Sequence, residues 1–166
     1  MTPALATPRD TLAAFFLGVV DDPSEDGLAA QRAAHPDAPA AALSYLRDRH
    51  LAGVAPAEPW ERTRAFDRVL RMILTAGGPD AARDLLALAL RVTDLHQLRA
   101  VVELVVGVVT PDELATALIA ALAPGHAPTI RATASTLAYH AFDALGDAYA
   151  PAPPLRLRLA ALLAPA

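Results

Sequence analysis

The sequence has no cysteine, no lysine and few aromatic residues (5%). The lack of cysteine excludes disulfide bonds, thiol nucleophiles and cysteine-ligated zinc, and it fits a reducing compartment, so we expect a cytoplasmic protein. All 14 basic residues are arginines, and the formal net charge is −4. A negative balance argues against a dedicated nucleic-acid-binding protein, although it leaves room for a local basic face.

Chemical signatures are also missing from the sequence. Its serines have no nucleophile-elbow context, and the chain has no glycine-rich phosphate loop. We therefore predict no cofactor and no metal, and nothing in the sequence indicates an enzyme. The longest charge-free stretch, residues 114–130, is broken by Pro124, Gly125 and Pro128, so we do not expect it to span a membrane.

The abundant residues of the sequence are apolar and favour helices. Hydrophobic residues make up 54% of the 166 positions, alanine is the commonest of them, and the 15 prolines fall between apolar segments. Only the "LRLRL" of residues 155–159 alternates as a strand would, and an isolated strand has no partner. The prediction is an all-α fold of about nine short helices. They are expected at residues 8–20, 25–34, 37–53, 59–76, 79–92, 94–109, 111–123, 128–148 and 155–163.

A repeat is suggested by two segments about 32 residues apart. "GPDAARDLLALAL" aligns with "TPDELATALIAAL" in its Pro-Asp pair and two leucines, which gives candidate copies at 78–109 and 110–141. Helix pairs of this length build α-solenoids such as HEAT and TPR stacks. We expect a single domain over residues 1–166, and leave open whether it is such a stack or a compact irregular bundle.

The first candidate site is a polar stripe in the long helix expected at 128–148. Thr136, His140, Asp143 and Asp147 recur at helical spacing, so their side chains share one face. An imidazole beside a carboxylate can bind a ligand or act as an acid–base couple. The simpler interpretation is a solvated face with a local His–Asp contact.

The second candidate site is an arginine-rich face at residues 62–71. Guanidinium groups bind phosphate and carboxylate groups, so the face could hold a small anion or nucleic acid. Acidic residues are interleaved, and Glu61 with Arg64 suits a pair within one helix, so a solvated face of ion pairs is the alternative. The arginines of this face are Arg62, Arg64, Arg68 and Arg71.

The third candidate lies in the helix expected at 94–109, which is apolar nearly all round and therefore expected to be central. Its thin polar stripe consists of His96, Arg99 and Glu103. If the helix is buried, these groups need internal partners, or they line a small polar pocket.

We therefore expect a non-catalytic helical protein that acts by protein–protein interaction or as a scaffold or regulatory domain. Its partner is another protein or itself, and a homodimer through the Ala/Leu-rich C-terminal helix is expected. The first alternative is anion or nucleic-acid binding through the arginine face. The second is a metal- or small-molecule-dependent activity around His140 and Asp143.

Overall fold

The computed structural model describes residues 6–164 and confirms the all-α prediction. Within the described residues there are nine α-helices and no strand. The chain divides into two compact units, one ending at Ala82 and one beginning at Arg83, so the division falls inside α5 (Gly78–Ala89). Each unit is described by itself below, and the expectation of one domain over residues 1–166 stays a prediction.

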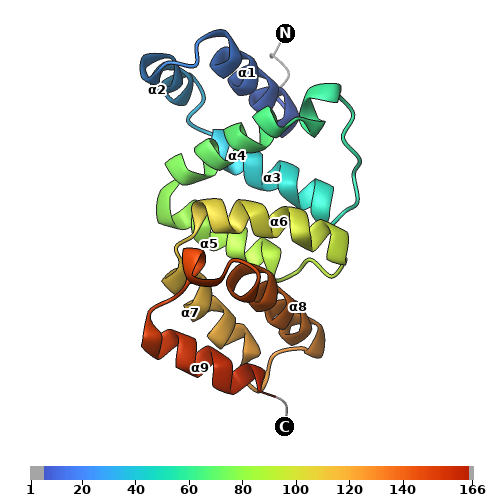
Figure 1. The fold of residues 1–166 in the computed structure, drawn as a ribbon. Coiled ribbons are helices and arrows are strands. Elements are labelled where there is room, and N and C mark those ends of the chain that lie inside the picture. Colours follow the sequence, from blue (N-terminus) through green and yellow to red (C-terminus); the bar gives the residue numbers. More distant parts are fainter. Residues whose placement is uncertain (1–5, 165–166) are drawn as a thin grey trace. The chain divides into compact units, whose positions relative to one another are not determined.

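The N-terminal unit is built from four helices before α5 (Figure 1). Helix α1 packs against α2 and α3, and α3 packs against α4. Aromatic side chains cluster in this unit, and the Phe66 ring meets Phe16, Tyr45 and Trp60 edge to face. The elements are α1 (Pro8–Asp21), α2 (Glu25–Ala34), α3 (Ala38–His50), the 3₁₀ turn η1 (Pro59–Arg62) and α4 (Arg64–Ala76).

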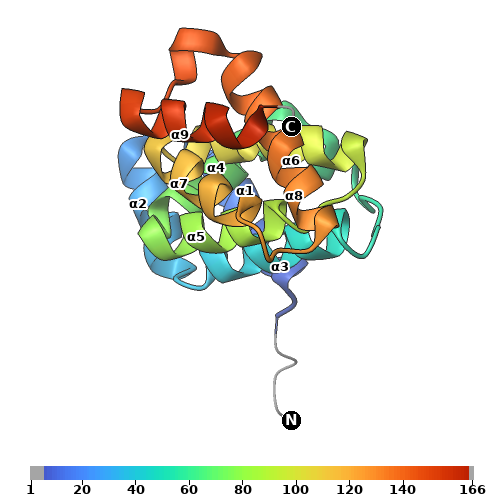
Figure 2. The same ribbon diagram turned by 90° about the horizontal axis from the view of Figure 1, so that it is seen from below.

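In the C-terminal unit, α7 packs against two other helices of the same unit. Helix α7 packs against both α8 and α9, and Figures 1 and 2 show α9 running beside α7. The Tyr149 hydroxyl donates a 2.6 Å hydrogen bond to the carbonyl oxygen of Val109, which ties the segment before α9 to the end of α6. The elements are α6 (Leu95–Val108), α7 (Pro111–Leu122), α8 (Pro128–Ala138), the π-helical turn η2 (Tyr139–Asp143), the 3₁₀ turn η3 (Gly146–Tyr149) and α9 (Pro153–Leu163).

Local sequence signals set most helix starts. The side chains of Thr7 and Ser24 accept hydrogen bonds from the backbone at the starts of α1 and α2, as expected of N-caps. Thr110 and Glu113 form a reciprocal capping box on α7. Asp37 is at the N-cap position of α3, but its side chain makes no capping hydrogen bond.

Two expected helices are interrupted. The helix expected at 59–76 breaks at Thr63, whose backbone is extended and whose hydroxyl caps α4 by accepting from the Phe66 N–H. The helix expected at 128–148 gives way to η2 after Ala138, and Gly146 follows at φ +57°. The π turn adds a residue to the helical turn, and Phe142 then stacks on Tyr149 with ring centroids 5.8 Å apart.

The helix-pair repeat at 78–109 and 110–141 stays a prediction. Helices α5 and α7, which open its two copies, each contain 12 residues. No helix among residues 6–164 combines the length and the apolar character that crossing a membrane requires.

Candidate functional site

The most elaborate polar cluster of the N-terminal unit surrounds the carboxylate of Glu61. This side chain is 0% exposed, although it lies in the short turn η1. The break at Thr63 and the packing of Trp60 on Phe16 and Phe66 turn η1 toward the core. Glu61 is therefore buried and does not form the expected surface pair with Arg64.

Three groups from distant segments meet the buried carboxylate. Arg9 on α1 forms an ion pair with it, with Nε 2.8 Å from Oε1, and Nη2 donates a 3.2 Å hydrogen bond to Oε2. The Nε–H is not aimed well enough at Oε1 for a hydrogen bond, so charge is the main attraction there. The Tyr45 hydroxyl and the Ala57 N–H each donate to Oε2 at 3.2 Å.

Arg49 extends this cluster toward the surface. One of its nitrogens, Nη1, donates to the Tyr45 hydroxyl at 3.3 Å and to the Glu61 backbone carbonyl at 3.4 Å. Burial raises the pKa of the Tyr45 hydroxyl, an effect that the Arg49 charge opposes and the Glu61 charge reinforces. The Tyr45 hydroxyl is therefore protonated at neutral pH and donates a hydrogen bond to the Glu61 carboxylate.

A cavity of about 260 Å³ lies beside this cluster. Two of its lining residues, Arg9 and Arg49, are the arginines that hold Glu61 and Tyr45, and Tyr45 itself lines the wall. Arg9 and Tyr45 could not be predicted as site residues from the sequence, because their partner Glu61 is far from both along the chain. The full lining is Thr7, Pro8, Arg9, Tyr45, Asp48, Arg49 and Val54.

The predicted arginine face is only partly a continuous surface. Arg62 belongs to η1 and donates to the Pro56 carbonyl at 3.2 Å, while Arg64 and Arg68 are exposed on α4. Arg71 is partly buried, and its Nε has no hydrogen-bond partner within residues 6–164. Anion or nucleic-acid binding by this face stays a prediction.

The predicted Thr–His–Asp stripe is divided between three elements. Thr136 is on α8, where its hydroxyl donates back to the Ala132 carbonyl, and His140 and Asp143 are in η2. Asp147 is in η3, and its Oδ1 lies 3.8 Å from Nη1 of Arg156 in an exposed ion pair. No group of three or more His, Asp or Glu side chains within residues 6–164 is arranged to hold a metal ion.

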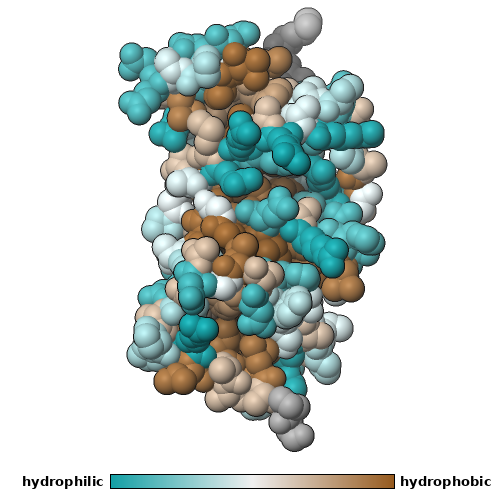
Figure 3. Space-filling view, in the orientation of Figure 1, coloured by the Kyte–Doolittle hydropathy of each residue, from teal (hydrophilic) through white to brown (hydrophobic). Residues whose placement is uncertain are grey.

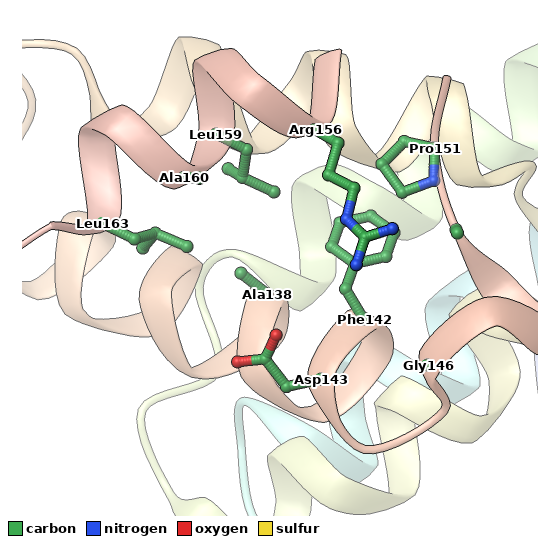
Figure 4. Close-up of a pocket in the computed structure, with 10 residues that line it drawn as sticks. Ala138, Phe142, Asp143, Gly146, Pro151, Arg156, Leu159, Ala160 and Leu163 are labelled. Atoms are coloured by element: carbon green, nitrogen blue, oxygen red, sulfur yellow. The ribbon is translucent and has the colours of Figure 1, made fainter. Parts of the chain in front are cut away.

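Asp143 instead lines a groove between η2 and α9. The groove has a volume of about 130 Å³ and an apolar wall that includes Phe142 and Leu159. Figure 4 shows Asp143 and Arg156 approaching this space from opposite elements. His140 is not among the residues that line it. Only Asp143 of the expected acid–base pair therefore lines the groove.

The third candidate differs from the expected buried stripe. His96, Arg99 and Glu103 are all exposed, because α6 turns a distinct apolar face inward and leaves its polar side to solvent. The inward side chains include Leu98, Val101, Val102, Leu104 and Val105.

The chain matches no protein-family model, no curated protein sequence and no solved structure.

Proposed function

We propose that this chain is a non-catalytic helical interaction protein that self-associates through the outer face of α9. The observation that supports the proposal is the exposure of apolar side chains on this helix. Leu157 is 73% exposed, whereas Leu159 on the opposite face is 5% exposed and packs inward. Leaving a leucine this exposed forgoes much of its burial energy, and another protein surface can recover it.

The outer face of α9 has a simple pattern. Leu157 and Ala161 stand at i and i+4 on one face of α9, Ala164 follows as the C-cap just past the end of the helix, and all three are exposed. Figure 3 shows hydrophobic surface in the region where α9 lies. One large side chain followed by two small ones gives a knob beside a shallow depression, where a second helix can approach closely.

A second copy of α9 fits this face in an antiparallel arrangement. Leu157 of one copy then lies against the alanines of the other, and the reverse contact follows by two-fold symmetry.

The expected association is weak. A helix of 11 residues is only about 16 Å long, so the contact is small. Burying Leu157 in both copies contributes about 1.5–3 kcal/mol each before the entropy of association is subtracted. The dimer should therefore form at high protein concentration and dissociate on dilution.

Sedimentation velocity over a range of concentrations tests this proposal. The wild-type chain is expected to shift from monomer to dimer, and Leu157→Glu is expected to remain a monomer because it places a charge on the contact. Leu17→Glu is the matched control, since Leu17 is 58% exposed on α1. Dimerisation unaffected by Leu157→Glu, or no dimer at any concentration, would contradict the proposal.

A further inference from the structure

The cavity beside Glu61 combines fixed guanidinium groups with hydrogen-bond donors that have no protein partner. Arg9 uses Nε and Nη2 toward Glu61, and Arg49 uses Nη1 toward Tyr45 and the Glu61 backbone. Within residues 6–164, Nη1 of Arg9 and both Nε and Nη2 of Arg49 make no hydrogen bond. Both side chains line the cavity.

These two arginines are held in place before any ligand arrives. The fully buried Glu61 carboxylate fixes Arg9, and the Tyr45 hydroxyl, whose residue is 6% exposed, fixes Arg49. Preorganised donors bind more tightly, because less side-chain freedom is lost on binding. A guanidinium with unused N–H groups is suited to the paired oxygens of a carboxylate or a phosphate.

The charged groups around the cavity restrict the charge that a bound anion can carry. Glu61 compensates one positive charge from inside, and Asp48, an exposed carboxylate, lines the same cavity as Arg49. Asp48 repels anions, and repulsion grows with the charge of the ligand. The site therefore suits a small anion of low charge better than a polyanion such as nucleic acid.

We propose that the cavity between the start of α1 and the end of α3 binds a small carboxylate or phosphate anion through Arg49 and Arg9. The contact is made by the unpaired guanidinium N–H groups of the two arginines. This site is distinct from the predicted arginine face at 62–71, and it does not depend on self-association through α9.

NMR titration of the full chain with inorganic phosphate, and separately with acetate, tests the proposal. Saturable shifts are expected for backbone amides around Arg9 and Arg49, with millimolar or tighter affinity. Saturation with both probes assigns a general oxyanion site, and saturation with one assigns the site to that anion. Absence of saturable shifts with either probe would overturn the proposal.

Two variants with opposite expected effects make the test specific. Arg49→Gln should weaken binding about tenfold or more, because it removes charge-assisted hydrogen bonds. Asp48→Asn should tighten binding about threefold, because it removes a nearby like charge. The Asp48 side chain makes no hydrogen bond within residues 6–164, so this second variant is expected to fold even if Arg49→Gln does not.

Arg64→Gln is the matched control, since Arg64 is an exposed arginine of the same unit. It should leave the affinity unchanged. Loss of binding in Arg64→Gln with full binding in Arg49→Gln would place the site on the α4 face and overturn the proposal. Unchanged affinity in Asp48→Asn would also contradict it.

Discussion

Replacing Glu61 with glutamine should destabilise the N-terminal unit by about 3 kcal/mol. The carboxylate is fully buried and accepts hydrogen bonds from Arg9, Tyr45 and the Ala57 N–H. Removing one partner of a buried ion pair costs about 3–5 kcal/mol, mainly because the other charge is left uncompensated. The Arg9 side chain is 37% exposed and can regain water, which places the expected cost at the lower end of that range.

Urea unfolding followed by circular dichroism measures this effect. Glu58→Gln is the matched control, because Glu58 is an exposed glutamate three positions earlier in the chain. We expect the free energy of unfolding of the control to lie within about 0.5 kcal/mol of the wild-type value, as is usual for surface substitutions. A Glu61→Gln variant that is equally unaffected would refute the role assigned to the buried carboxylate.

A double-mutant cycle isolates the ion pair from the other contacts of Glu61. The partner substitution is Arg9→Met, which keeps an apolar stem without the guanidinium. Residues in direct contact usually couple by about 0.5–3 kcal/mol. Since these two side chains are 2.8 Å apart, we expect a coupling of at least about 1 kcal/mol. A coupling indistinguishable from zero would show that the two charges do not stabilise each other.

Three further substitutions test other parts of the structure. Tyr149→Phe should cost about 1–3 kcal/mol by leaving the buried Val109 carbonyl unpaired. Burial, aided by the Glu113 charge, raises the pKa of Tyr149 from 10.0 to about 12. The stability that this protonated hydroxyl contributes is therefore fully present below pH 10 and is lost as pH rises through 12. Alkaline unfolding curves should therefore show a smaller loss in Tyr149→Phe than in wild type. Thr110→Ala should cost about 1 kcal/mol in urea unfolding by removing the α7 cap. Hydrogen bonds from the Thr110 backbone N–H and, to a lesser extent, from its hydroxyl lower the pKa of Glu113, so the stability that they contribute is present above pH 4.5 and lost as pH falls. The variant keeps the backbone hydrogen bond and loses the hydroxyl part, so it should lose less stability in acid than wild type does. Gly77→Ala should lower the thermal midpoint, since its Cβ would lie 2.6 Å from Ala81 Cβ and 2.9 Å from Pro39 Cβ; an unchanged midpoint would contradict this packing.

Local signals made most of the helical fold predictable. The caps at Thr7, Ser24 and Thr110 are determined by neighbours within three residues, so their sequence pattern is sufficient. The apolar face of α4 was also readable, because its period is a property of one helix. The burial of Glu61 was not readable, since it depends on Arg9, a residue 52 positions away along the chain.

The sequence does contain a signal for the break before α4, namely Thr63. Thr63 stands three residues before Phe66, which is the spacing of an N-cap, and it marks the true start of α4. Pro59 is also a helix-start signal, and a helix that begins there places Glu61 on the surface. The π turn at the end of α8 had no such signal, because Phe142 meets Tyr149 only through tertiary packing.

Disulfide trapping tests self-association through α9 most directly. The chain has no cysteine, so one cysteine introduced at Ala161 can cross-link only to its counterpart in a second copy. In the proposed antiparallel contact we expect the two introduced cysteines to approach closely enough for a disulfide. We predict rapid formation of a covalent dimer in Ala161→Cys, and its loss when Leu157→Glu is added. Equally slow cross-linking of Ala161→Cys and of Ala14→Cys, an exposed position on α1, would contradict the account.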